Sequence, residues 1–261
     1  MILLVYHIFT LKLVILSKFF NIAPKIKEMA KILMFGTQKG GAGKTCVSVM
    51  TATALSQPPF NLKTVVIDLD HQKSVVRTRK FDLRAYQAET VPFEVLSYSI
   101  SDLQANIGQL DKDYQLIIID VAGKLDNTQP VEIQEITKAL IYVDYLFIPF
   151  VAGSYNLEST VEYFQFIKQV QTIRAVQPRP LNVRGFVNMQ RKKSRANAFL
   201  NEDLETLKES ERLLMLDTAL NDYALFRESD TITSLYDAKS NDSAKANFST
   251  FLNELLSTIS K

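Results

Sequence analysis

Apolar residues along this chain gather in short runs, separated by longer stretches in which they recur every three or four positions. The short runs are typical of buried strands and lie at Ile32–Phe35, Thr64–Asp70, Val91–Leu96, Leu116–Asp120, Tyr145–Val151, Val183–Met189 and Arg212–Leu216. The periodic stretches are typical of helices and lie at Cys46–Leu55, Ser101–Leu110, Val131–Ile141, Leu157–Val176 and Asn197–Glu209. This alternation predicts an α/β fold, a doubly wound and mostly parallel sheet with helices on both faces.

Two helix details follow from local chemistry. We expect Ser101 to cap the helix that it opens, with Asp102 in the first turn. The C-terminal stretch carries an apolar stripe of Phe248, Phe251, Leu252, Leu255 and Ile259. A helix lying on a membrane surface would carry Lys or Arg on its polar face, whereas this face holds Asn, Ser, Thr and Glu254. We therefore expect the stripe to pack into the core.

Residues 1–28 begin with an apolar segment of another kind, from Met1 to Phe20. Lys12 and Lys18 interrupt it, and it lacks the charged start and the cleavage site of a secretory signal. Met29 then stands almost directly before the first strand. We expect residues 29–261 to form a single domain and residues 1–28 to be an upstream extension, and an N-terminal membrane anchor is the alternative.

Composition narrows the class of protein. The net charge of +2 is too small to indicate a partner, so only local clusters of charge matter. One cysteine, Cys46, excludes a disulfide framework and fits the cytoplasm. Two histidines argue against a histidine-based metal centre or proton relay.

A glycine-rich segment joins the first strand to the first helix. It consists of Gln38, Lys39, Gly40, Gly41, Ala42, Gly43, Lys44 and Thr45. Glycines allow backbone N–H groups to converge on phosphate oxygens, and the helix that follows points its positive end at the same anion. Lys44 would reach the β- and γ-phosphates, and the Thr45 hydroxyl would ligate Mg²⁺. The sequence therefore predicts a phosphate-binding loop.

Two aspartates follow buried strands, where ligands of such sheets lie. Asp120 comes after four apolar residues, the Walker B arrangement, in which the carboxylate holds Mg²⁺ directly or through water. Asp70 is placed to orient an attacking water or to contact the metal shell.

The loop departs from the general pattern G-x-x-x-x-G-K-[ST], because Gln38 stands at the first glycine position and a second lysine, Lys39, follows it. In this form it resembles the deviant Walker A loop of the ParA/MinD family of P-loop ATPases, and ParA-type partition ATPases most closely. The segment that ends in Asp70-His71-Gln72 resembles the family's D-x-D-P-Q, with His71 in place of proline. The likeness covers about residues 30–237 and is weakest in the second half of the chain.

The resemblance implies a slow, Mg²⁺-dependent ATPase that dimerises when it binds ATP. Lys39 would reach the nucleotide of the other subunit, and Asp70 matches the aspartate linked to hydrolysis, so Lys39, Lys44 and Asp70 are the implied catalytic residues. Cys46 directly follows the loop and Asn188 matches a position that faces adenine. A ParB-type or other partner protein would stimulate the hydrolysis of ATP.

Basic residues cluster twice. The first cluster contains no acid and consists of Arg174, Arg179, Arg184, Arg191, Lys192, Lys193 and Arg195. The second consists of Lys73, Arg77, Arg79 and Lys80. Such clusters give affinity for any nucleic acid, although a solvated surface is the alternative. We expect nonspecific DNA binding in plasmid, chromosome or mobile-element partitioning, with Arg191, Lys192, Lys193 and Arg195 as candidates and the nucleoid as the location of the ATP form. The alternative is a MinD-like membrane or regulatory switch that binds no DNA.

Overall fold

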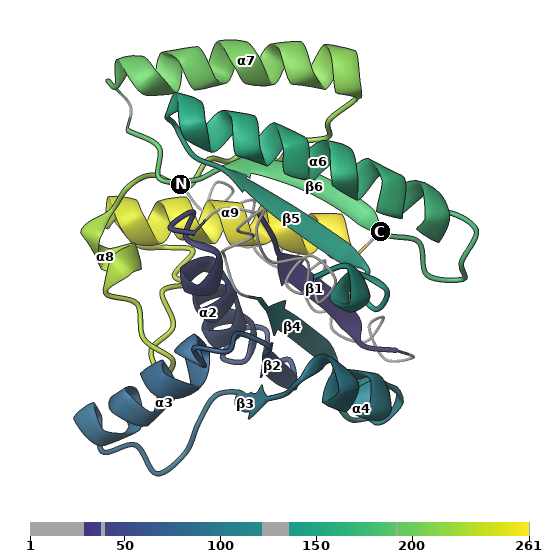
Figure 1. The fold of residues 1–261 in the computed structure, drawn as a ribbon. Helices are drawn as coiled ribbons and strands as arrows, with labels where there is room; N and C mark the ends of the chain where they lie inside the picture. Colours follow the sequence, from purple (N-terminus) through teal and green to yellow (C-terminus); the bar gives the residue numbers. More distant parts are fainter. Residues whose placement is uncertain (1–28, 38–39, 122–135, 192, 261) are drawn as a thin grey trace, which may run out of the picture.

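The computed structural model describes residues 29–37, 40–121, 136–191 and 193–260, and a parallel sheet lies at its centre. The strands are β1 (Lys31–Phe35), β2 (Thr64–Asp68), β3 (Glu94–Ser97), β4 (Leu116–Asp120), β5 (Tyr145–Phe150) and β6 (Asn182–Val187). They form a six-stranded sheet in the order β3-β2-β4-β1-β5-β6, and all neighbours pair in parallel (Figure 1). The predicted fold class is confirmed, because parallel strands need helical crossovers and the chain supplies them.

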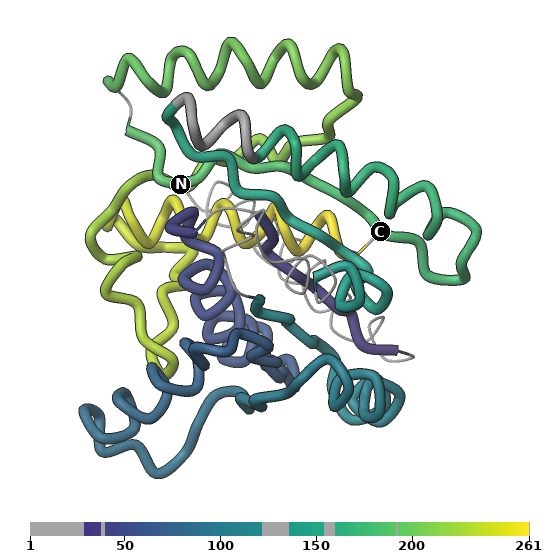
Figure 2. The backbone as a smooth tube through the Cα atoms, in the orientation of Figure 1, coloured from purple at the N-terminus to yellow at the C-terminus, as the bar shows by residue number. Residues whose placement is uncertain are grey.

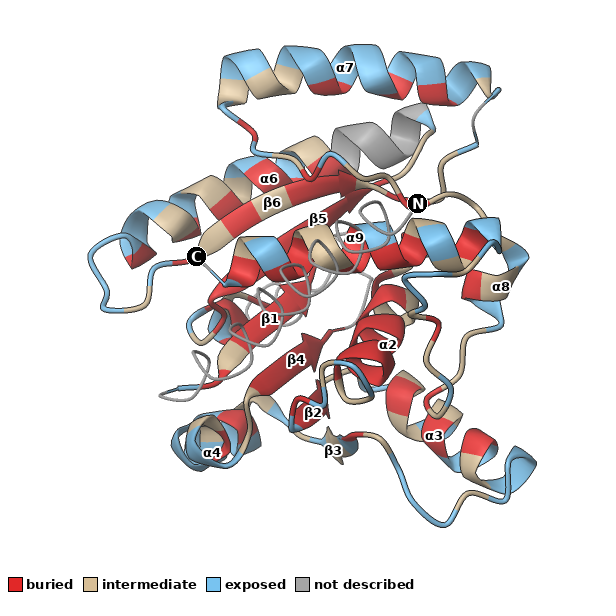
Figure 3. Ribbon diagram, turned by 180° about the vertical axis from the view of Figure 1, so that it is seen from behind, coloured by how far each residue is buried: buried red, intermediate tan, exposed pale blue. Residues whose placement is uncertain are grey.

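Helices cover both faces of this sheet. They are α2 (Lys44–Leu55), α3 (Ser74–Ala85), α4 (Ile100–Asp113), α6 (Ser154–Arg174), α7 (Arg195–Glu211), α8 (Ala224–Arg227) and α9 (Ser243–Ile259). The apolar faces of α2 and α9 pack on one side of the sheet, and those of α4, α6 and α7 contribute to the core on the other side (Figure 3). Of the helix predicted at Val131–Ile141, residues 136–140 are helical. Residues 131–135 lie outside the described residues.

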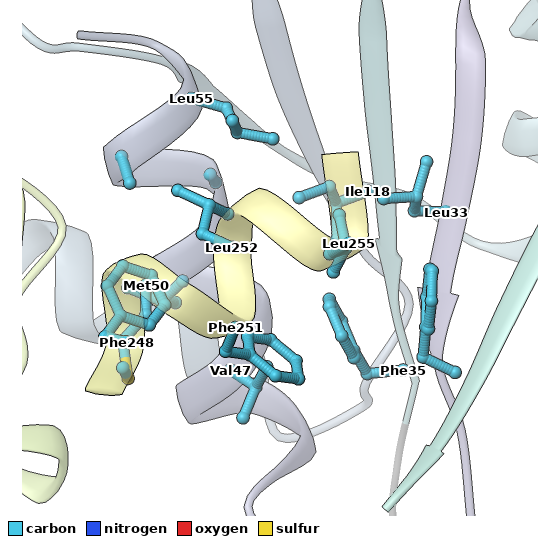
Figure 4. Close-up of a cluster of buried hydrophobic side chains, with 14 of the residues drawn as sticks. Leu33, Phe35, Val47, Met50, Leu55, Ile118, Phe248, Phe251, Leu252 and Leu255 are labelled. Atoms are coloured by element: carbon cyan, nitrogen blue, oxygen red, sulfur yellow. The ribbon is translucent and has the colours of Figure 1, made fainter. Parts of the chain in front are cut away.

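Alternation along β1 builds the two halves of the core. Leu33 and Phe35 point to the side of α2 and α9, whereas Ile32 and Met34 point to the side of α4 and α6. Figure 4 shows the first of these clusters, in which strand residues meet side chains from both helices. The cluster includes all of the predicted C-terminal stripe, namely Phe248, Phe251, Leu252, Leu255 and Ile259, each fully buried. The prediction that α9 packs into the core is therefore confirmed.

Several predicted boundaries were wrong for local reasons. Helix α4 is capped by Ser99 rather than by Ser101: the Ser99 hydroxyl accepts from the backbone N–H of Asp102, and the Asp102 carboxylate accepts from that of Ser99. The third strand begins at Glu94 rather than at Val91, beyond Pro92, which cannot donate to a ladder.

One predicted element was wrong and one helix was missed. Residues Arg212–Leu216 do not form a strand, since a single isolated bridge joins Met215 to Gly185. The side chain of Leu214 is exposed. Helix α3 was not predicted at all, since basic residues interrupt its apolar spacing. None of the helices in the described part of the chain combines the length and the apolarity that crossing a membrane would need.

Candidate nucleotide site

The glycine-rich loop connects the end of the central strand β1 to the start of α2, as predicted. Gly41 and Gly43 adopt φ values of 79° and 81°, in the left-handed region that favours glycine. Gly43 is also the N-cap of α2, and a Cβ there would lie 2.6 Å from Nδ2 of Asn188. Both the turn and the close approach therefore require glycine at position 43. Gln38 and Lys39 lie outside the described residues.

Lys44 opens α2 and is buried, with 5% of its surface exposed. Burial lowers the pKa of its ammonium to about 8, and the nearby carboxylates of Asp120 and Asp70 oppose that shift. The ammonium therefore stays mostly protonated at neutral pH although it is buried. A polyphosphate bound at this loop would meet a desolvated cation at the N-terminus of a helix.

Asp120 ends β4 beside the loop and is completely buried. The Thr45 hydroxyl donates to one of its carboxylate oxygens at 2.9 Å, and the Ser48 hydroxyl donates to the other at 3.4 Å. Burial raises the pKa of Asp120 to about 7 against the opposing effects of the Thr45 hydrogen bond and the Lys44 charge. The sequence analysis did not identify Ser48, although it stands one helical turn after Lys44.

This arrangement fits Mg²⁺. The Thr45 and Asp120 oxygens are adjacent hard ligands, which Mg²⁺ prefers, and Mg²⁺ commonly completes its shell with phosphate oxygens and water. Across the described residues, no group of three or more His, Cys, Asp or Glu side chains could hold a metal ion. A magnesium ion at this place would therefore depend on the bound nucleotide for most of its remaining ligands.

Asp70 lies two residues beyond the end of β2, on the same edge of the sheet, and is half-buried. Its carboxylate accepts from the backbone N–H of Gln72 at 2.8 Å and from the Ser74 hydroxyl at 3.2 Å. Its charge acts on both Lys44 and Asp120. The structure thus brings Lys44, Asp70 and Asp120 together as predicted, although the Asp70 carboxylate is held by the start of α3.

Asn188 follows β6 and packs directly on the loop. Its amide donates to the carbonyl of Ala42 at 2.8 Å, and only 5% of its surface is exposed. A small hollow beside it is lined by residues of α2 and α8 and of the segments that follow β6 and precede α8, among them Met50, Tyr223 and Phe226. Asn221 lines the same hollow, and its buried Oδ1 has no hydrogen-bond partner among the described residues. This free acceptor can bind the amino group of a base that lies against the hollow.

Cys46 lies between the loop and this hollow. Its thiol donates to the carbonyl of Phe226 at 2.9 Å, and burial raises the pKa of the thiol. The side chain therefore stays protonated and links α2 to α8, on the wall of the hollow.

The first basic cluster does not form one surface. Arg174 is buried and donates to the carbonyl of Leu140, and Arg179 forms ion pairs with Asp144 and Asp111. These two arginines therefore hold the fold together and are not available to DNA.

The four DNA-binding candidates after β6 differ from one another. Arg191 is exposed but forms an ion pair with Asp222 at 2.7 Å. Lys193 and Arg195 are exposed, with the Arg195 guanidinium stacked over the ring of Phe199. Lys192 lies outside the described residues. Among the described candidates, Lys193 and Arg195 have the more accessible charges.

Several solved structures share this fold. A putative plasmid partition protein from Borrelia burgdorferi B31 bound to AMPPNP is 21% identical, with a TM-score of 0.61, over 88% of this chain and 100% of that one. An ATP complex of McdA from Cyanothece is 15% identical, with a TM-score of 0.62, over 87% and 96% of the two chains. The MinD cell division protein of Aquifex aeolicus is 13% identical, with a TM-score of 0.60, over 87% and 98%.

Comparison of the sequence itself identifies the family. None of the curated protein sequences matches this chain significantly. The family profile described as the CobQ/CobB/MinD/ParA nucleotide binding domain matches residues 33–227, which include the glycine-rich loop, both aspartates and the hollow beside Asn188. The chain therefore belongs to the CobQ/CobB/MinD/ParA family of nucleotide-binding domains.

Proposed function

We propose that residues 29–261 form a Mg²⁺-dependent ATPase domain, which dimerises when it binds ATP and acts in DNA partitioning. The observation that carries the proposal is the hydrogen bond between Thr45 and Asp120, beside the buried ammonium of Lys44. This group combines one cation for phosphate with two oxygens for a metal, at the N-terminus of a helix. The AMPPNP-bound and ATP-bound relatives support the choice of ATP as the nucleotide.

Each residue has a distinct part in the proposed reaction. Lys44 neutralises charge on the β- and γ-phosphates. Thr45 and Asp120 would hold Mg²⁺, whose positive charge would offset the negative charge of the leaving group. Asp70 orients the water that attacks the γ-phosphate. Because the Asp70 carboxylate is held by Gln72 and Ser74, we expect slow hydrolysis until a partner protein releases it.

Dimerisation supplies the switch. Lys39 is proposed to contact the nucleotide of the partner subunit, so that the γ-phosphate favours the dimer and hydrolysis undoes it. This role rests on the match of Lys39 to the second lysine of the deviant Walker A loop.

DNA is proposed as the target of the dimer, with the ATP form located on the nucleoid in the cytoplasm. The exposed side chains of Lys193 and Arg195 support contact with phosphates. A MinD-like membrane switch is the alternative. The burial of the apolar face of α9 argues against it, because a membrane helix at the C-terminus would need that face free.

Co-sedimentation with nonspecific duplex DNA tests this proposal. We expect the protein to bind DNA with ATP but not with ADP, and the affinity to fall steeply as salt rises. Reversing the charges in Lys193→Glu/Arg195→Glu should weaken binding by about tenfold or more, because two phosphate contacts become repulsive.

The matched control reverses two exposed cations elsewhere, in Lys112→Glu/Lys239→Glu, and should bind DNA about as tightly as the parent protein. Anionic liposomes provide the competing target. ATP-dependent liposome binding without DNA binding would replace the proposal with the membrane switch.

A further inference from the structure

Helix α3 presents a row of cations with an exposed aromatic ring among them. Arg77, Lys80 and Arg84 are exposed and recur every three or four residues, which places them along one face of the helix, and Lys73 is the exposed N-cap residue before its first turn. They span about 16 Å along its axis. Phe81 lies within this row and is 70% exposed, although a phenyl ring normally avoids water. We call these five residues the α3 stripe.

The opposite side of α3 is anchored to the protein by a buried polar cluster. Arg79 donates to the Thr231 hydroxyl and to the Phe93 carbonyl, each at 2.8 Å. Asp82 accepts from the backbone N–H and the hydroxyl of Thr231 at 2.8 and 2.7 Å. The segment after α8 therefore runs against α3, as the tube shows (Figure 2).

This anchoring leaves the α3 stripe without an acidic side chain. Asp82 is the only acid of α3, and it faces inward with Arg79. The sequence suggested Arg79 and not Arg84 as a member of the second basic cluster. In the structure Arg79 is buried, whereas Arg84 is exposed. The exposed face of α3 and its N-cap residue thus carry four positive charges and Phe81.

The first turn of α3 is hydrogen-bonded to the candidate nucleotide site. The Ser74 hydroxyl donates to the carboxylate of Asp70 at 3.2 Å, and the backbone N–H groups of Val75 and Val76 donate to Asp68 at 3.0 and 3.1 Å. A ligand that moved α3 would therefore also act on Asp70.

We propose that the α3 stripe docks an acidic segment of a partner protein, with an apolar side chain of that segment packed on Phe81. The inference rests on the proposed function, in which a partner releases Asp70 and so speeds ATP hydrolysis. Arginines around an aromatic anchor are typical of the energetic centre of protein interfaces. Carboxylates pair well with guanidinium groups, and Arg77 and Arg84 lie on either side of Phe81 in the sequence.

Other anionic partners fit this surface less well. A duplex phosphate backbone offers no apolar group to cover Phe81. A membrane helix needs an apolar face of several large residues, but Val75 is buried and Val76 and Leu83 are only partly exposed. Phe81 is therefore the one large apolar side chain of α3 that is strongly exposed. A protein segment satisfies both the charges and the ring.

A labelled random copolymer of glutamate and tyrosine is a suitable probe, with polyglutamate as its counterpart without rings. Fluorescence anisotropy on the full chain, without nucleotide, measures the affinity. We expect Arg77→Glu/Arg84→Glu to weaken copolymer binding by about tenfold or more, since two attractive charges become repulsive. Phe81→Ser should weaken binding of the copolymer by about threefold or more and leave that of polyglutamate unchanged.

Controls separate this surface from general basicity. Lys112→Glu/Lys239→Glu changes net charge equally, and Leu214→Ser removes another exposed apolar side chain, so both should bind the copolymer as the parent does. Far-UV circular dichroism verifies that all variants are folded. Equal copolymer affinity of the parent and the α3 variants would overturn the proposal.

Two further arms use the same variants with duplex DNA and with phosphatidylglycerol vesicles. The proposal would also be overturned if the protein bound DNA or vesicles through the α3 stripe but did not bind the copolymer. The assay contains no nucleotide, so failure of ATP-dependent dimerisation or of DNA binding would not change its result.

Discussion

A Lys44→Ala variant is expected to lose affinity for Mg²⁺–AMPPNP by about 100-fold or more, because Lys44 and the bound phosphates would form a desolvated charge pair, and truncating one partner of such a pair costs about 2–5 kcal/mol of binding free energy. Lys44 is buried beside Asp120 and Asp70, where water screens its charge poorly. Lys44 is also the only lysine in the first turn of α2. Isothermal titration calorimetry measures the affinity directly.

The control for this variant is Lys112→Ala, which removes an exposed lysine from α4 and should bind Mg²⁺–AMPPNP as tightly as the parent protein. The account also predicts that Lys44→Ala stays folded, since the change removes a desolvated ammonium from the interior. A folded variant whose affinity fell less than about fivefold would show that Lys44 does not hold the phosphates.

Asp120→Asn is expected to stabilise the nucleotide-free protein while it weakens Mg²⁺-dependent nucleotide binding. The folded state raises the pKa of Asp120 to about 7, above its ordinary value of 3.8. The folded state therefore binds this proton more tightly than the unfolded state does. The free energy of unfolding therefore falls as pH rises between these two values. Asparagine removes this cost, so the gain in stability should be roughly 2 kcal/mol larger at pH 8 than at pH 5.

Denaturant unfolding in the presence of a chelator measures this difference. The difference is smaller than the full shift of the pKa would give, because the interval from pH 5 to pH 8 contains only the upper part of the range between 3.8 and 7. Asp113→Asn, on the exposed end of α4, is the matched control and should show little dependence on pH. A gain that was the same at both pH values, or larger at pH 5, would mean that Asp120 does not carry a buried charge.

The sequence was most informative where chemistry is local. Gly43, Lys44 and Thr45 are consecutive, so their joint role follows from the loop and the helix that they connect. Asp120 was identified because four apolar residues place it at a strand end, and its contact with Thr45 follows from β1 pairing directly with β4. The parallel sheet was predictable from the same alternation of strands and helices.

Long-range contacts decided the features that the sequence analysis missed. Asn221 reaches the hollow beside Asn188 because Gln190 bridges to Asn221, a pairing that no local pattern encodes. Arg179 belonged to a run of cations in the sequence, yet its partner Asp144 is 35 residues away. A run of basic residues in the sequence does not indicate which of them form ion pairs, because the partners of each side chain depend on the tertiary fold.

Helix α3 illustrates the same limit within one element. Its apolar spacing is too sparse to predict a helix, because Arg79 and Asp82 occupy positions on its buried side. Their hydrogen bonds to Thr231, about 150 residues later in the chain, make that burial possible.

Light scattering of the protein without nucleotide, with Mg²⁺–ADP and with Mg²⁺–ATP is the most direct test of the central claim, an ATP-driven dimerisation switch. The account predicts a monomer in the first two conditions and a dimer in the third, with Lys39→Ala remaining monomeric in all of them. A parent protein that has the same mass in all three conditions, or a Lys39→Ala variant that dimerises with ATP as the parent does, would contradict it.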